Sequence, residues 1–127
     1  MPFPVEDRCV ELAETKLSVR FPEPHRRALL RRNGGVVEVR PGDFWELFPV
    51  KDDSDIVRLK RTWDDIVRQT TLARGWRGFP PAAIAIGHDG CGNKLVLVPE
   101  GMAELRLAVW DHENGQLDFV ESDIFEE

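Results

Sequence analysis

The segment His88-Asp89-Gly90-Cys91 contains three side-chain types that carry out thiol chemistry in many enzymes. A cysteine thiolate is a nucleophile, a histidine can accept its proton, and a carboxylate can orient that histidine. The three residues are nearly adjacent in the sequence, whereas catalytic triads are spatial groups usually drawn from separate segments. We therefore interpret the segment as a turn with solvated side chains, and we expect no catalytic residue in this chain.

His88, Cys91 and His112 are also residue types that bind zinc. Their spacing matches no standard zinc pattern, and the sequence offers no evident fourth ligand. The glycines around Cys91 do not form a phosphate-binding loop, because an apolar run follows them where a helix N-terminus is needed. We expect neither a metal ion nor a cofactor.

Carboxylates concentrate in the last part of the sequence. Residues 111–127 contain seven acidic side chains and no Lys or Arg. Paired carboxylates can catalyse acid–base reactions, but no basic or polar cluster accompanies these, so a solvated acidic rim is the simpler interpretation. A one-signed rim can also steer a partner of opposite charge, which makes a protein-docking surface the second interpretation.

The composition indicates a soluble globular protein, and the length of 127 residues fits one domain spanning residues 1–127. The longest apolar run is far shorter than the ~20 residues that a membrane span needs. The first residues show no basic region followed by an apolar stretch, so we expect no signal peptide. Cys9 and Cys91 fit a reducing compartment, and we expect a cytoplasmic protein without membrane contact. The net charge of −6 argues against direct nucleic-acid binding.

The stretch 84–98 must position the residues discussed above. Its two apolar runs, residues 84–87 and 95–98, flank a loop rich in Gly, Asp and Asn, which is typical of a β-hairpin. The second run is apolar at every position, so we expect this strand in the interior of a sheet.

Helices are expected mainly before this hairpin. Apolar residues at helical spacing predict a helix over residues 5–16, and a second over residues 23–32 with His25 on its buried stripe. Residues 56–59 indicate a weaker helix start. Thr62, with Asp65 three residues later, indicates a stronger start for a helix that reaches residue 74.

Further strands are expected at residues 36–39 and 44–48, around a Pro-Gly turn, and at residues 105–110 and 117–120, around Asn114-Gly115. The fold class that follows is α+β: a single domain with a mainly antiparallel sheet of about five to six strands and helices chiefly from the N-terminal half.

Several motifs occur in an order that resembles the SUKH superfamily, the Smi/Knr-type domain, over about residues 5–125. His88 and Cys91 are variations within the loop motif. The quoted motifs are Asn33-Gly34-Gly35, Phe44-Trp45-Glu46-Leu47-Phe48, Gly87-His88-Asp89-Gly90-Cys91-Gly92-Asn93 and Val109-Trp110-Asp111-His112-Glu113.

This resemblance implies a non-catalytic α+β domain whose shared motifs set turns and strands. Bacterial members look like immunity proteins that bind and neutralise a cognate toxin, often a nuclease, in polymorphic toxin–antitoxin systems. A fungal branch acts in cell-wall regulation through protein contacts. We expect an immunity protein that acts by stoichiometric association with its toxin. The alternatives are a regulatory or scaffold domain with another protein partner, or a small enzyme, which would need a cleft of convergent titratable groups.

A toxin that cleaves nucleic acid must contact phosphates with Lys and Arg, so an acidic inhibitor can occupy its cleft and mimic nucleic acid. Trp63 and Trp110 lie at periodic positions and are predicted core residues. Trp76 lies in a loop rich in Gly and Pro and could be an exposed anchor, although loop tryptophans more often pack on their own domain. The predicted partner-binding residues are Trp76 and the acidic residues Asp111, Glu113, Asp118, Glu121, Asp123, Asp52 and Asp53.

Overall fold

A hairpin forms the centre of the fold, in a computed structural model that describes residues 2–101, 104–121 and 124–125. Strands β3 (Ile84–His88) and β4 (Lys94–Val98) pair antiparallel, and four of the five residues in each are buried. Over the described residues, the sheet has six strands in the order β1-β2-β3-β4-β5-β6. β4 therefore lies in the sheet interior, as its continuous apolar run predicted.

The remaining strands extend the sheet on both sides of this hairpin, and every neighbouring pair is antiparallel. β1 (Gly35–Arg40) and β2 (Asp43–Leu47) lie on one side, and β5 (Arg106–Trp110) and β6 (Leu117–Phe119) on the other. The described chain thus confirms the predicted α+β class and its mainly antiparallel sheet.

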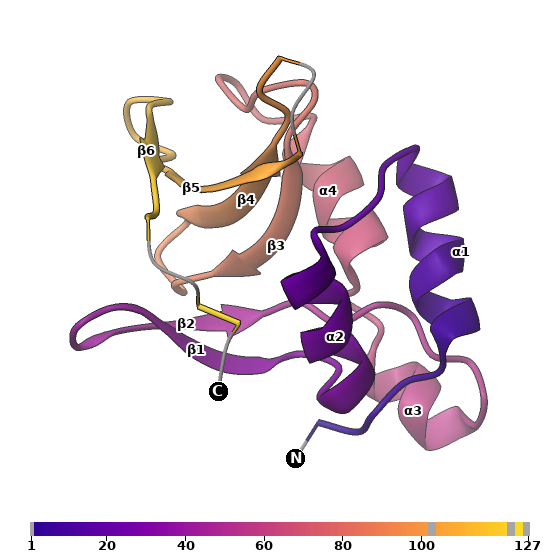
Figure 1. Cartoon of the computed structure of the whole chain (residues 1–127). Coiled ribbons are helices and arrows are strands. Elements are labelled where there is room, and N and C mark those ends of the chain that lie inside the picture. Colours follow the sequence, from indigo (N-terminus) through magenta and orange to yellow (C-terminus); the bar gives the residue numbers. More distant parts are fainter. Residues whose placement is uncertain (1, 102–103, 122–123, 126–127) are drawn as a thin grey trace.

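The sheet curls, so that the β1–β2 hairpin runs at an angle to β3 and β4 (Figure 1). The seam between the two parts is short: β2 and β3 are paired at Glu46↔His88 and Leu47↔Gly87, and the Phe48 N–H donates to the Ile86 carbonyl at 2.8 Å. At this seam a β-carbon on Gly87 would lie 2.7 Å from the backbone oxygen of Glu46. Only glycine lets the two strands approach so closely.

The helices lie together on one side of the sheet (Figure 1). They are α1 (Asp7–Leu17), α2 (Glu23–Arg31), α3 (Ile56–Arg61) and α4 (Ile66–Ala73). α4 packs on β3, and α1 packs on both α2 and α4. Helices come chiefly from the first half of the chain, as expected, and none in the described ranges has the length and apolarity that a membrane crossing demands.

The predicted start of the helix before the central hairpin was wrong. Asp65, not Thr62, caps α4, since its side chain accepts the Arg68 N–H at 2.9 Å. Thr62 instead ends α3 and is buried, with its hydroxyl bonded to the carbonyl of Arg58. Trp63 consequently falls in the turn between the two helices and is 60% exposed. The prediction that Trp63 is a core residue was therefore wrong as well, because it assumed that the helix began one turn earlier.

His25 is a polar side chain inside the apolar core. It is fully buried on α2, as predicted, between the rings of Phe21 (5.0 Å) and Phe125 (4.8 Å). Neither ring nitrogen has a hydrogen-bond partner among the described residues. Burial without a partner disfavours the charged imidazolium, and it lowers the His25 pKa to about 3.

Candidate partner-binding surfaces

The last residue of β3, His88, and the loop that follows it hold the three residues considered for thiol chemistry, and their side chains have separate structural contacts. One Asp89 carboxylate oxygen accepts the Cys91 N–H at 2.7 Å, and the other accepts the Asn93 side-chain amide at 2.9 Å. The His88 ring stacks on Phe48, with ring centroids 5.2 Å apart. The carboxylate of Asp89 therefore orders the loop backbone, while the imidazole of His88 packs on Phe48, the residue directly after β2.

His112, the third residue considered as a zinc ligand, fastens this loop to the β5–β6 loop. Its Nδ1 lies 2.8 Å from Asn93 Oδ1, which also accepts the His112 backbone N–H at 3.2 Å. The ring covers the backbone of Gly92, where a β-carbon would lie 3.0 Å from it. Among the described His, Cys, Asp and Glu side chains, no group of three or more is placed to hold a metal ion.

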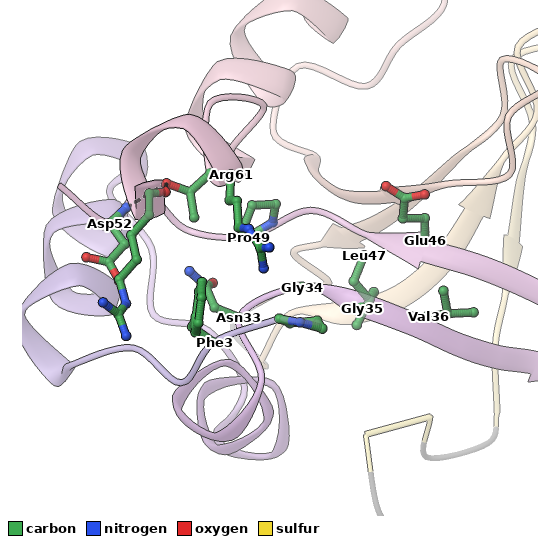
Figure 2. Close-up of a pocket in the computed structure, with 13 residues that line it drawn as sticks. Phe3, Asn33, Gly34, Gly35, Val36, Glu46, Leu47, Pro49, Asp52 and Arg61 are labelled. Carbon is green, nitrogen blue, oxygen red and sulfur yellow. Dashed lines mark hydrogen bonds and ion pairs between the residues drawn. The ribbon is translucent and has the colours of Figure 1, made fainter. Parts of the chain in front are cut away.

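Asn33 has an equally structural position, in the hollow shown in Figure 2. Its amide nitrogen donates to the Val50 carbonyl and its amide oxygen accepts the Val50 N–H, both at 2.8 Å. One buried side chain thus satisfies both backbone groups of a residue 17 positions away. The quoted motifs around Asn33 and Asp89 therefore hold turns and segments together, which is the role that the resemblance implies for them.

The hollow around Asn33 has a volume of about 370 Å³. Phe3 lies in it beneath two guanidinium groups of α3, with Arg58 at 4.4 Å and Arg61 at 4.9 Å from the ring centroid (Figure 2). The carboxylate of Asp52, at the same hollow, accepts the Ser54 N–H and lies 3.8 Å from Arg58. These charged groups hold the N-terminal segment and the start of α3 in place.

Two of the predicted partner-binding carboxylates occupy the β5–β6 loop. Asp111 accepts the Glu113 N–H at 2.8 Å, which tightens the turn. Glu113 is exposed, and its carboxylate forms no ion pair with any residue of the described ranges. Within the described residues, this loop is therefore a part of the predicted acidic rim whose carboxylates have no cationic partner.

Two further carboxylates of the rim already have cationic partners. Asp118 on β6 pairs with Arg40 at 2.7 Å, and Glu121 pairs with Arg106 at 3.3 Å. Both pairs are solvent-exposed, so they are weak and exchangeable, but they reduce the negative field of this edge. Asp123 lies outside the described residues.

Asp52 and Asp53 do not join this rim. Asp52 is 5% exposed and bonded to its own loop, and exposed Asp53 lies 3.4 Å from Arg8. They precede α3, which Figure 1 shows at the opposite side of the molecule from β6. The structure therefore divides the predicted acidic set between two distant places.

Trp76 combines the two interpretations that its loop allowed. Its ring stacks on the buried Trp110 at 6.1 Å, with the Lys94 ammonium 4.9 Å from the ring centroid, and the residue is still 42% exposed. Trp110 is 1% exposed and donates its indole N–H to the Gly78 carbonyl, which confirms its prediction as a core residue.

Trp63 is the surface aromatic that the sequence analysis missed. It separates two hollows of about 360 Å³ and 380 Å³, one towards α4 and one towards the β3–β4 hairpin. The signal that could have revealed it is Asp65. Asp at an N-cap followed by the apolar pair Ile66-Val67 places the helix start after Trp63.

Comparison with protein families matched residues 4–126 to the SMI1 / KNR4 family (SUKH-1). The matched range contains all the helices and strands described above. No match was found among curated proteins.

Proposed function

Because the chain belongs to the SMI1 / KNR4 family (SUKH-1), we propose that it is an immunity protein that binds and neutralises a cognate protein toxin. The family is generally a non-catalytic, immunity-type domain. The observation that carries the proposal is the family match over residues 4–126. The structural role of the motifs in this proposal is supported by Asn33, Asp89 and Asn93, whose side chains form hydrogen bonds within the chain.

The contact surface in this proposal is centred on the β5–β6 loop, with Asp111 and Glu113. Charge supports this choice, because the chain carries −6 overall and Glu113 is exposed without an internal ion pair in the described chain. A toxin that acts on nucleic acid has a basic cleft, and a negative loop accelerates the encounter with it. Asp118 and Glu121 contribute after exchanging Arg40 and Arg106 for cations of the toxin.

Inhibition in this proposal is by stoichiometric occupancy. The protein blocks the toxin by remaining bound, so high affinity and a slow dissociation rate are what inhibition needs, and no chemical step is involved. The rival function is a regulatory or scaffold domain, which would bind a different protein and would leave toxin activity unchanged.

The decisive experiment co-expresses the chain with the toxin encoded beside its gene. Growth should be rescued by this chain and not by an immunity protein of an unrelated toxin. A catalytically inactive form of the toxin should co-purify with the chain at a fixed stoichiometry. Unrescued growth, with both proteins soluble and no complex formed, would reject the immunity function.

A further inference from the structure

Trp63 is mostly exposed, but the turn that carries it is anchored to the fold. Three residues of the turn are buried, since Thr62 is 6% exposed, Asp65 8% and Ile66 0%, whereas Asp64 is exposed. The Ile66 N–H also donates to the Pro49 carbonyl at 2.8 Å, which ties the turn to the segment after β2. A large apolar side chain presented in this way loses little conformational entropy on binding, and that favours its use as an anchor.

One side of Trp63 is an apolar hollow with a cationic rim. Leu59, Val67 and Leu72 line it together with Trp63, and we call these four residues the Trp63 groove. Val67 is half-buried, whereas Leu72 is 49% exposed, so apolar surface continues from the hollow onto the outer face of α4.

The rim of the Trp63 groove carries Lys16, Lys51 and Arg68. The Arg68 guanidinium lies 5.4 Å from the centroid of the Trp63 ring. The carboxylate that lines the groove belongs to Asp65, and it is turned inward to cap α4. Lys16 and Lys51 act electrostatically on Asp65 and oppose the effect of burial, which raises its pKa. Arg68 is also paired with Asp64 at 3.5 Å in an exposed, exchangeable contact, so Lys16 and Lys51 supply most of the positive charge that the rim offers to a ligand.

The side chains that line the hollow on the other side of Trp63 also carry more positive than negative charge. It is lined by Lys60, Arg61 and Lys94, against the carboxylates of Glu46 and Asp64. Cations thus outnumber carboxylates on both sides of Trp63, in a chain whose net charge is −6. This concentration of positive charge around an exposed aromatic favours an anionic ligand with an apolar portion.

We propose that the Trp63 groove binds a segment of a partner protein in which a large apolar side chain is flanked by Asp or Glu. The apolar side chain packs against Trp63, Val67 and Leu72, and the flanking carboxylates pair with Lys16, Lys51 and Arg68. An anionic membrane presents similar chemistry, but the overall negative charge repels it over distances beyond the groove. α3 and α4 lie away from β6 (Figure 1), and the groove selects charge opposite to that selected by the β5–β6 loop. The inference therefore does not depend on the proposed toxin contact.

The test uses a synthetic peptide with a central Leu-Trp pair flanked on each side by Asp-Glu, added to the full-length, isotope-labelled chain. Amide shifts should concentrate at Trp63, Val67 and Leu72, and at the Trp63 indole N–H. A peptide with Lys in place of the acids should bind at least about tenfold more weakly, and so should one with Ala-Ala at its centre.

Variants separate the groove from the rest of the surface. Trp63→Ala and the pair Lys16→Glu/Lys51→Glu should each weaken peptide binding at least about tenfold. Trp63→Ala should leave the unfolding temperature nearly unchanged, because the side chain is mostly exposed. The double charge reversal should lower the unfolding temperature, because it places carboxylates near the capping carboxylate of Asp65, but the variant should remain folded at the temperature of the titration. Phe44→Ala is the matched control, since Phe44 is a similarly exposed aromatic on β2, at 61%. It should leave binding unchanged.

Several outcomes would overturn the inference. One is the absence of saturable shifts at millimolar peptide, and another is shifts centred on β6. Equal binding of the acidic and Lys-flanked peptides would remove the charge argument. Binding to phosphatidylglycerol vesicles that is lost in Trp63→Ala, without binding of the peptide, would assign the groove to a membrane surface instead.

Discussion

Arg26 of α2 forms an ion pair with Glu14 of α1. The Arg26 Nε lies 3.2 Å and 3.1 Å from the two carboxylate oxygens of Glu14, and Nη2 lies 3.1 Å from one of them. The side chains are only 11% and 10% exposed. Glu14 also accepts the buried N–H of Phe21 at 2.7 Å. One carboxylate thus joins two helices and closes the segment between them.

Removing only one partner of this pair should be costly. Glu14→Gln leaves the poorly solvated Arg26 guanidinium without its counter-charge and with fewer acceptors, and we expect it to lower the free energy of unfolding by about 2–4 kcal/mol. Urea denaturation measures the change. The double variant Glu14→Leu/Arg26→Met should be less destabilised than the sum of the single variants, and simple additivity would contradict the coupling.

Gly87→Ala should disrupt the seam of the sheet. Its β-carbon would lie 2.7 Å from the Glu46 backbone oxygen, so β2 and β3 would have to separate. We expect a loss of about 2–4 kcal/mol of unfolding free energy. Gly75→Ala is the control, because its β-carbon meets its nearest backbone oxygen at 3.4 Å and should cost less than about 1 kcal/mol. Equal effects of the two substitutions would refute the close approach as the cause.

Asn33→Ala should leave the N–H and the carbonyl of Val50 without their partners. Both groups are part of a buried arrangement, so we expect a destabilisation of about 2–4 kcal/mol. Asn114→Ala removes an exposed side-chain hydrogen bond to the Gln116 N–H and should cost less than about 1 kcal/mol. Thermal unfolding of the two variants makes the comparison, and a stable Asn33→Ala protein would show that water replaces the amide.

His25 should make stability fall in acid. Its pKa is lowered to about 3 in the fold, against about 6.5 in the unfolded chain, so between these values the unfolded state binds the additional proton. The contribution is fully present above pH ~6.5 and is lost as the pH falls towards ~3, at up to ~1.4 kcal/mol per pH unit. His25→Leu should reduce the slope of unfolding free energy against pH in this window by up to ~1.4 kcal/mol per pH unit, which corresponds to the uptake of one proton. An unchanged slope would mean that His25 finds a partner or solvent when protonated.

Glu113→Lys should slow association with the cognate toxin. Glu113 is exposed without an internal ion pair in the described chain, so its charge acts directly on an approaching cationic surface. We expect a reduction of about threefold to tenfold in the association rate at low salt, which should fade as salt is added. Glu121→Lys should also slow association, and it would place a cation beside Arg106.

The control for this experiment is Glu11→Lys, which makes the same charge change on the exposed face of α1. Stopped-flow mixing with inactive toxin measures all three variants. If Glu113→Lys and Glu11→Lys associate equally fast at low salt, the β5–β6 loop is not the surface that the toxin approaches.

The sequence was sufficient for features that depend on neighbouring residues. Turn residues between two apolar runs predicted the β3–β4 hairpin, and the continuous apolar run predicted its interior place in the sheet. Helical spacing placed His25 in the core. These predictions held because turn formation and the burial of one face are decided within a few residues of chain. The same local logic failed at Trp63. A helix that begins at Thr62 would bury Trp63, whereas the helix that begins after Asp65 leaves Trp63 in an exposed turn.

Tertiary structure alone decided which charges remain available to a partner. The sequence shows Asp118 in an acidic stretch, yet the curl of the sheet brings it to Arg40, 78 residues away, and separates Asp52 and Asp53 from the rim. Likewise, Lys16, Lys51 and Arg68 are scattered along the chain and surround Trp63 only after α1 and α4 have packed. Electrostatic fields depend on distance in space, and that distance is set by long-range packing that no short window of sequence contains.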